Sequence, residues 1–366
     1  MDFRDAPEEA AFRERLRAWL AENAGRFPTS SAAGDDYWAR QGDWHRALHT
    51  AGFFGLSWPR AYGGHALPPV YDVILDEELA LAGARPRPSL GYLVQGLGRH
   101  GSEELRQRFL PGLVDGTERW CQGFSEPGAG SDLASLTTSA TRDGDSYVLN
   151  GHKIWTSYSD VADWCLLLAR TDPDAPRHKG ISAFVVSMGQ PGVEQRPLRM
   201  MNGVTSEFGQ VVLDGARVPA DRMVGAPGEG WALAMTVVGH EREPAELGFS
   251  ARYGKLVRDL TARTEGTSLP AELAWAAVQT EMLRLHLRRR LSERLDGVRH
   301  GPEGSLDKLL MTWVEQDVGH AALAVGTTRD AELFSDYLYS RSQSVMGGTS
   351  QIQKNIIASR ILGLGA

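Results

Sequence analysis

The sequence predicts an α+β protein in which a β-rich segment separates two helical ones. Apolar residues recur at helical spacing in the first third, short β-rich runs follow, and long amphipathic stretches return towards the end. A chain of 366 residues can bury a large core. We therefore expect an N-terminal α-helical domain over residues 1–117, a middle β domain over 118–228 and a C-terminal α-helical domain over 229–366.

The N-terminal segment contains two clear helical signals. The first is an apolar stripe at i, i+4, i+7 and i+8, and Gly25 and Pro28 are expected to end that helix. The second helix is expected at 70–82, after the breaker cluster Tyr62-Gly63-Gly64. The stripe consists of Phe12, Leu16, Trp19 and Leu20.

In the middle segment the sequence pattern changes from helical spacing to short β-rich runs. Turn signals at Asp143-Gly144-Asp145 and Asn150-Gly151 separate β-rich runs. Helical patterns then return at about 272–296 and 305–325. The expected strands include Ser146–Leu149, Trp164–Leu168 and Ile181–Val186.

The amino-acid composition is that of a globular protein and argues against nucleic acid as a partner. Hydrophobic residues make up 42% of the chain and charged residues 23%, as in globular proteins. With 39 basic and 46 acidic residues the formal charge is −7, which argues against nucleic acid or an anionic membrane as a partner. The N-terminus Met1–Asp5 is charged, and no run of 18 apolar residues occurs. We expect a cytoplasmic protein.

The two cysteines, Cys121 and Cys165, lack the spacing of a metal or redox motif. Both stand among apolar residues, so we expect reduced core thiols. His240-Glu241 begins like a zinc-protease helix, but Pro244 stands where the second histidine would be. No metal site is expected.

The most informative stretch is the run of small and hydroxyl-bearing residues Gln122–Asp132. It lacks a dinucleotide fingerprint, because Leu133 replaces the third glycine. It lacks a hydrolase nucleophile elbow, because Pro127 stands two places after Ser125. An ordinary glycine-rich surface loop is one interpretation. The other is a turn whose backbone N–H groups and hydroxyls face a heteroaromatic ring.

This run resembles the flavin-binding signature of the acyl-CoA dehydrogenase family, and the resemblance continues along the chain. Four motifs appear in the family's order over more than 200 residues, which makes the match specific. After the first run come Gly151–Ser157, Val218–Arg222 with Gly228–Trp231, and Gly347–Gln353.

The resemblance implies an FAD cofactor at the junction of two helical domains and a β domain. It places Trp155 beside the flavin ring, Ser157 near its N5 atom, and Thr349 on the adenosine-diphosphate half. Ser131 is also expected to touch the thioester ligand, and Arg242 the coenzyme portion. The expected cofactor-binding residues are Gln122, Phe124, Ser125, Gly130, Ser131, Trp155, Thr156, Ser157, Gly348, Thr349 and Gln351.

The catalytic base departs from the commonest family pattern. Family chemistry removes a proton α to a thioester carbonyl and passes the β hydrogen as hydride to flavin. Many members carry the base at the position of Gly347, which has no side chain. Other members carry it in an earlier helix, in a glutamate immediately before an arginine, and Glu241-Arg242 matches that pattern. We expect Glu241 to be the base; the alternative is a solvated charged patch.

Partners are also implied by the resemblance: an acyl-CoA or acyl-carrier thioester, and an electron acceptor such as electron-transfer flavoprotein. The family's Arg-x-x-Phe-Gly run is poorly matched by Ala251–Leu256. In this departure the chain resembles an actinobacterial subgroup of the family that acts on steroid side-chain thioesters. Members of that subgroup often pair two different subunits. Arg252 or Arg258 could instead replace the missing arginine in a homo-oligomer. The competing functions are a non-catalytic partner subunit and a flavin monooxygenase or oxidase.

Overall fold

The computed structural model describes residues 4–27, 35–205, 207–242, 248–265, 268–298, 301–326 and 330–365. The chain divides into two compact units. The helical unit comprises Met1–Ser30, His65–Pro88 and Glu241–Ala366, and the sheet unit comprises Ser31–Gly64 and Ser89–His240. This division into two units does not test the three domains expected from the sequence, which remain a prediction.

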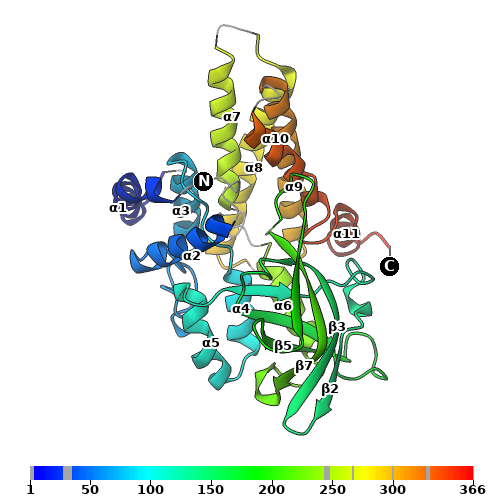
Figure 1. The fold of residues 1–366 in the computed structure, drawn as a ribbon. Helices are drawn as coiled ribbons and strands as arrows, with labels where there is room; N and C mark the ends of the chain where they lie inside the picture. Colours follow the sequence, from blue (N-terminus) through cyan, green and yellow to red (C-terminus); the bar gives the residue numbers. More distant parts are fainter. Residues whose placement is uncertain are drawn as a thin grey trace. The chain divides into compact units, whose positions relative to one another are not determined.

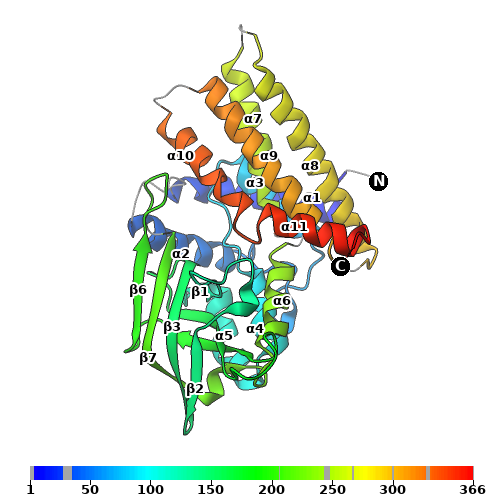
Figure 2. The same cartoon turned by 90° about the vertical axis from the view of Figure 1, so that its right-hand side faces the viewer.

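The sheet unit is built on one eight-stranded sheet with strand order β6-β7-β3-β2-β4-β5-β8, and β1 pairs in parallel with β4. Figure 2 shows β6, β7, β3 and β2 side by side. Its elements are α2 Asp35–Thr50, η3 Arg60–Tyr62, α4 Gly91–His100, α5 Glu103–Asp115, β1 Trp120–Gly123, η4 Leu133–Ser135, β2 Ser139–Asp143, β3 Ser146–Ser157, β4 Trp164–Arg170, β5 Ile181–Ser187, β6 Val193–Leu198, β7 Phe208–Pro219, η5 Ala220–Arg222, β8 Met223–Val224 and α6 Gly230–His240.

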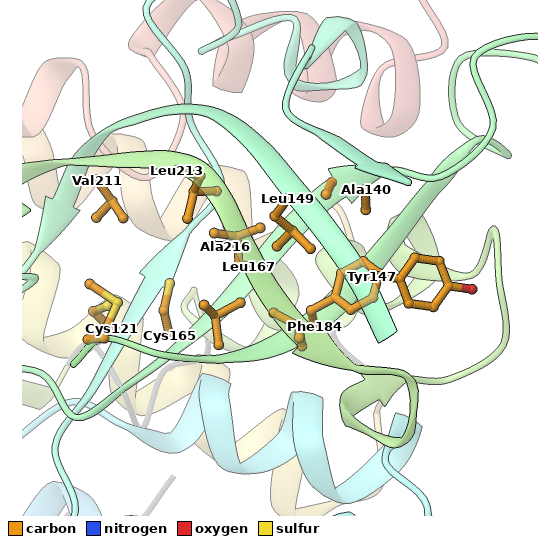
Figure 3. Packing of buried hydrophobic residues seen from close by; sticks show 14 residues of the cluster. Cys121, Ala140, Tyr147, Leu149, Cys165, Leu167, Phe184, Val211, Leu213 and Ala216 are labelled. Carbon is orange, nitrogen blue, oxygen red and sulfur yellow. The ribbon is translucent and has the colours of Figure 1, made fainter. Parts of the chain in front are cut away.

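A buried apolar cluster holds the sheet together (Figure 3). It includes both cysteines, which lie opposite each other on the paired strands β1 and β4. Both are free thiols, and burial raises the pKa of Cys121 well above its usual value. The expectation of reduced core thiols is therefore confirmed.

One expected turn is wrong. Asn150-Gly151 was predicted to end a strand, but both residues lie inside β3, at a register shift against β7. The Asn150 side-chain oxygen accepts a hydrogen bond from the backbone N–H of Gly215 at 2.8 Å. A Cβ at Gly151 would lie 2.4 Å from Thr138 Oγ1, so only glycine fits there. The extra residue lies on β7, between Leu213 and Ala216, so β3 continues through Asn150 and Gly151 opposite a bulge in its partner strand.

The helical unit contains the remaining helices, and Figure 1 shows α7, α8 and α9 running alongside one another. Their apolar faces meet in a core that includes Leu260, Leu273 and Val314. The elements are α1 Pro7–Asn23, η1 Ala24–Arg26, α3 Val70–Leu81, η6 Gly248–Ser250, α7 Ala251–Arg263, α8 Ala271–Leu295, α9 Gly304–Val325, α10 Ala331–Ser340, η7 Ser342–Ser344, α11 Ser350–Ile356 and the π-helical turn η8 Ile357–Ile361.

The helices predicted from apolar spacing are confirmed in α1, α3, α8 and α9. Phe12, Leu16 and Leu20 are the buried residues of α1. That helix ends just before Gly25, whereas Pro28 lies outside the described residues. Across the described part of the chain, no helix combines the length and apolar character needed to span a membrane.

Candidate active site

In the sheet unit, the glycine-rich turn and β3 are held together by backbone hydrogen bonds. The N–H of Ile154 donates to the carbonyl of Ser125 at 3.0 Å. Within the turn, Glu126 and Ala129 each donate a backbone hydrogen bond to the other, at 3.1 and 3.0 Å. The first two sequence motifs therefore form one local structure, although about thirty residues separate them.

A buried ion pair fixes the same junction. Lys153 Nζ donates to Glu126 Oε1 at 2.8 Å and to the carbonyl of Phe124 at 3.2 Å. The Glu126 carboxylate also accepts from the backbone N–H groups of Thr137 and Thr138, at 2.7 and 2.8 Å. The side chain of Lys153 is fully buried and that of Glu126 is 5% exposed. Sequence reasoning missed this pair, whose signal is a glutamate inside the first motif and a lysine inside the second.

Burial and pairing act in opposite directions on the two pKa values. Burial raises the pKa of Glu126, but the Lys153 ammonium and the hydrogen bonds outweigh it and bring that pKa to about 2. Burial dominates for Lys153 and lowers its pKa to about 8, although Glu126 opposes the shift. Both groups are therefore charged at neutral pH.

Trp155 has a strained backbone and an exposed ring. Its φ is 60°, in the left-handed region that bulky residues rarely adopt, at a register shift between Lys153 and Thr156. Its side chain is 62% exposed and meets Phe208 edge-on, with the ring centroids 6.4 Å apart. Lys153 and Thr156, which flank the register shift, are both buried and restrain the backbone between them. An exposed indole on a fixed backbone is suited to cover a flat ring.

The environments of the other predicted residues in this unit differ. Thr156 is buried, and its hydroxyl has no hydrogen-bond partner among the described residues, so it is open to a ligand donor or acceptor. Phe124 is buried, Gln122, Ser125 and Ser157 are partly buried, and Gly130 and Ser131 are exposed.

In the helical unit, the C-terminal motif forms a tight turn into α11. Gly347 and Gly348 have φ values of 64° and 89°, which glycine adopts without steric cost. Thr349 is the N-cap of α11, and its hydroxyl accepts a hydrogen bond from the backbone N–H of Ile352 at 3.1 Å. Gln351 is exposed.

Glu241 and Arg242 lie against this turn. Arg242 donates from Nη2 to the carbonyl of Gly347 at 2.8 Å, and Gln353 Nε2 donates to the same carbonyl at 3.0 Å. A Cβ built on Gly347 would lie 3.9 Å from Glu241 Oε1. Residues over a hundred positions apart thus meet, and a carboxylate comes close to a position that has no side chain of its own.

One detail of the prediction for Glu241 is wrong. The resemblance placed it inside the helix that begins at Gly230, but α6 ends at His240 and Glu241 occupies the following turn. Pro244 lies outside the described residues.

Two cationic side chains, the partly buried Arg242 and the buried Lys308, lie against the turn. Burial lowers the pKa of Arg242, and the charge of Glu241 opposes this shift. The Nε atom of Arg242 has no hydrogen-bond partner within the described ranges. Lys308 on α9 donates to the carbonyl of Gln343 at 2.6 Å. Sequence reasoning missed Lys308; its signal is a lysine directly before the apolar run Leu309–Met311.

Among the residues that the structure describes, no group of three His, Cys, Asp or Glu side chains is arranged to hold a metal ion.

Comparison with known proteins defines the class. Models of the acyl-CoA dehydrogenase N-terminal, middle and C-terminal domains match residues 6–117, 121–216 and 228–362. The chain is 37% identical over 380 residues to acyl-CoA dehydrogenase IpdE1 of Mycobacterium tuberculosis, covering 96% of this chain and 97% of that one.

Comparison with solved structures points to the same family. A Tcur3481-Tcur3483 steroid ACAD superposes with a TM-score of 0.87 at 27% identity, covering all of both chains. The ChsE4-ChsE5 complex from Mycobacterium tuberculosis superposes with a TM-score of 0.84 at 26% identity, again over all of both chains.

Fold and motifs thus define a flavoprotein-type oxidoreductase. The chain belongs to the acyl-CoA dehydrogenase family, and is an acyl-CoA dehydrogenase. The resemblance seen in the sequence and the expected α+β fold are confirmed.

Proposed function

We propose that this protein dehydrogenates an acyl-CoA thioester between its α and β carbons, with Glu241 as the base. The observation that carries the proposal is the approach of Glu241 Oε1 to Gly347, at 3.9 Å from a Cβ built there. The resemblance implies a glutamate at 347 in many relatives. A carboxylate that reaches the same place from position 241 supports a relocated base rather than a lost one.

The surrounding charges suit proton abstraction. The carboxylate must be ionised to accept the α proton, and the nearby cations Arg242 and Lys308 favour that state. Arg242 is already anchored to the turn through the carbonyl of Gly347. From there we expect it to orient the coenzyme portion of the substrate. This pattern speaks against the alternative of a non-catalytic subunit.

We propose FAD as the cofactor, which when bound would accept the β hydrogen as hydride. The residues fit a flat ring: Trp155 is exposed on a strained backbone, and the buried Thr156 hydroxyl lacks a partner among the described residues. Ser125 and Ser157 would donate to the ring edge, and Thr349 and Gln351 would hold the adenosine-diphosphate half. The remaining expected ligands are Gln122, Phe124, Gly130, Ser131 and Gly348.

The substrate class we propose is a thioester with a steroid-derived acyl group. Its support is the similarity to the Tcur3481-Tcur3483 steroid ACAD over the whole chain. Ser131, exposed at the end of the glycine-rich turn, would contact the thioester.

The test is an anaerobic screen in which acyl-CoAs, straight-chain and steroid-derived, are mixed with flavin-loaded protein. We expect flavin bleaching with a steroid-derived acyl-CoA, slow reoxidation in air, and fast reoxidation by electron-transfer flavoprotein. Rapid reoxidation in air would favour the oxidase or monooxygenase alternative, and bleaching by none of the thioesters would contradict the proposal.

Two substitutions test the ring-binding residues. Trp155→Ala should weaken flavin binding, because the ring loses an aromatic cover. Ser157→Ala should lower the reduction rate more than the flavin content, because a donor near the reduced ring stabilises arriving charge. Flavin content by absorbance and stopped-flow bleaching rates separate the two effects. Unchanged content in the first variant and an unchanged rate in the second would show that the motif is misassigned.

We also propose a hetero-oligomer, in which a homologous subunit supplies the missing arginine to the cofactor. Arg252, one candidate replacement, is directed to its own chain: it lies 3.7 Å from Glu315 and over the Tyr253 ring. The similarity to the ChsE4-ChsE5 complex supports this assembly.

We expect the chain purified alone to hold less than one flavin per subunit, and co-expression with a homologous subunit to restore binding and raise thermal stability. Flavin content and mass measured together test this. One tightly bound flavin per chain in an active homo-oligomer would overturn the hetero-oligomer.

A further inference from the structure

Lys308 is a buried cation that the family motifs do not include. It lies on α9 and is 5% exposed. Its ammonium group donates to the carbonyl of Gln343, in the segment that leads into the Gly347 turn. The hydroxyl of Thr312, one turn further along α9, donates to the same carbonyl at 3.3 Å. Two side chains of one helix thus hold the start of this segment.

Lys308 also reaches the position of the base. A Cβ built on Gly347 would lie 3.7 Å from Lys308 Cε and 3.9 Å from Glu241 Oε1. The lysine stem and the carboxylate therefore border the same small space within the helical unit. Lys308 is buried, and Glu241 and Gly347 are partly buried, so water screens a cation and a carboxylate here less than it screens a fully exposed pair.

Among the described residues, three charged groups act on Lys308. Burial, and then the charge of Arg242, lower the pKa of Lys308 to about 8, while Glu241 and Glu315 oppose the shift. Glu315 is engaged by the Tyr253 hydroxyl and lies near Arg252.

Asp307, next to Lys308 in sequence, binds two side chains of α8. His286 Nε2 lies 2.7 Å from Asp307 Oδ1, and Arg290 Nε lies 3.5 Å from Oδ2. Asp307 is therefore engaged on the α8 side, and within the described ranges the carboxylates that act on Lys308 are those of Glu241 and Glu315.

We propose that Lys308 is a positioning residue for the proposed base: it holds the Gln343–Gly348 segment in place and keeps the Glu241 carboxylate ionised. The inference rests on the proposed function, because it assigns Lys308 a role only through Glu241. Removing its charge raises the proton affinity of Glu241, so the base becomes protonated at a higher pH.

The test measures the pH dependence of kcat/KM with the acyl-CoA found in the screen. Lys308→Met and Lys308→Gln should each move the acid limb of the profile upward by about one pH unit. Lys308→Gln keeps an N–H donor without the charge, so its comparison with Lys308→Met separates the charge from the hydrogen-bonding group. Lys308→Arg, which keeps the charge, should restore the limb towards its original position.

Thr312→Val is the matched control. It removes the other hydrogen bond to the Gln343 carbonyl, and the bond of the same hydroxyl to the Lys308 carbonyl at 2.9 Å, without changing charge, so its acid limb should stay in place. Flavin content and thermal unfolding, measured on every variant, show which proteins are folded. If Lys308→Met does not fold, Lys308→Gln decides.

An unshifted limb in the neutral variants, or an equal shift in Thr312→Val, would overturn the electrostatic role. Glu241→Gln tests the underlying assignment separately. A Glu241→Gln variant that keeps full activity would refute the base itself, whereas an inactive one beside unshifted Lys308 variants would refute only the role of Lys308.

Discussion

Glu241→Gln should lower the rate of substrate-dependent flavin reduction by about 10²-fold or more while leaving yellow, flavin-loaded protein. The amide has nearly the shape of the carboxylate but cannot accept the α proton. The side chain lies beside the Gly347 turn, so the isosteric change should not disturb that turn. Stopped-flow bleaching under anaerobic conditions measures the rate, and absorbance measures the bound flavin.

A second substitution in the same protein sharpens this result. Gly347→Glu in the Glu241→Gln background should restore part of the rate, because the new side chain starts 3.9 Å from the original carboxylate oxygen. Recovery should be incomplete, since φ at 347 is 64° and a non-glycine residue there costs about 1–3 kcal/mol. Bleaching at the wild-type rate in Glu241→Gln alone would rule out Glu241 as the base.

Lys153→Met should lower the free energy of unfolding by about 3–5 kcal/mol, because it leaves the Glu126 carboxylate buried without its partner charge. Adding Glu126→Gln should recover part of that loss, since the buried charge is then gone. Urea unfolding of the two variants and the wild type measures both effects. Wild-type stability in Lys153→Met would show that the pair does not hold the junction.

The matched control for the buried pair lies in the same region. Arg177 and Asp132 form an ion pair at 3.0 Å, but their side chains are 67% and 62% exposed. Arg177→Met should change the stability little, because water screens an exposed pair.

The buried pair of Glu126 and Lys153 also makes the free energy of unfolding depend on pH in the acid range. The folded-state pKa of Glu126, at about 2, lies below its ordinary value, so its contribution is present above the ordinary pKa and is lost as pH falls towards the folded value. We expect Glu126→Gln to flatten the decline in stability between about pH 4 and pH 2. An unchanged slope in that window would show that other carboxylates cause the acid sensitivity.

The sequence determined the local structure and the family. The stripe of Phe12, Leu16 and Leu20 specified α1, because helical spacing alone puts these residues on one face. The four motifs indicated the family because their order and spacing can be recognised in the sequence without knowledge of any tertiary contact. The two thiols were assigned correctly because their apolar neighbours indicate burial.

Only the tertiary structure decided how distant residues meet. Local pattern could not show that Asn150-Gly151 continues β3 rather than ending it in a turn, because this depends on the pairing with β7. Nor could it pair Glu126 with Lys153, or bring Glu241 and Lys308 to the space beside Gly347. Such contacts depend on how helices and strands pack, and periodicity specifies which face is buried but not which residue lies opposite it.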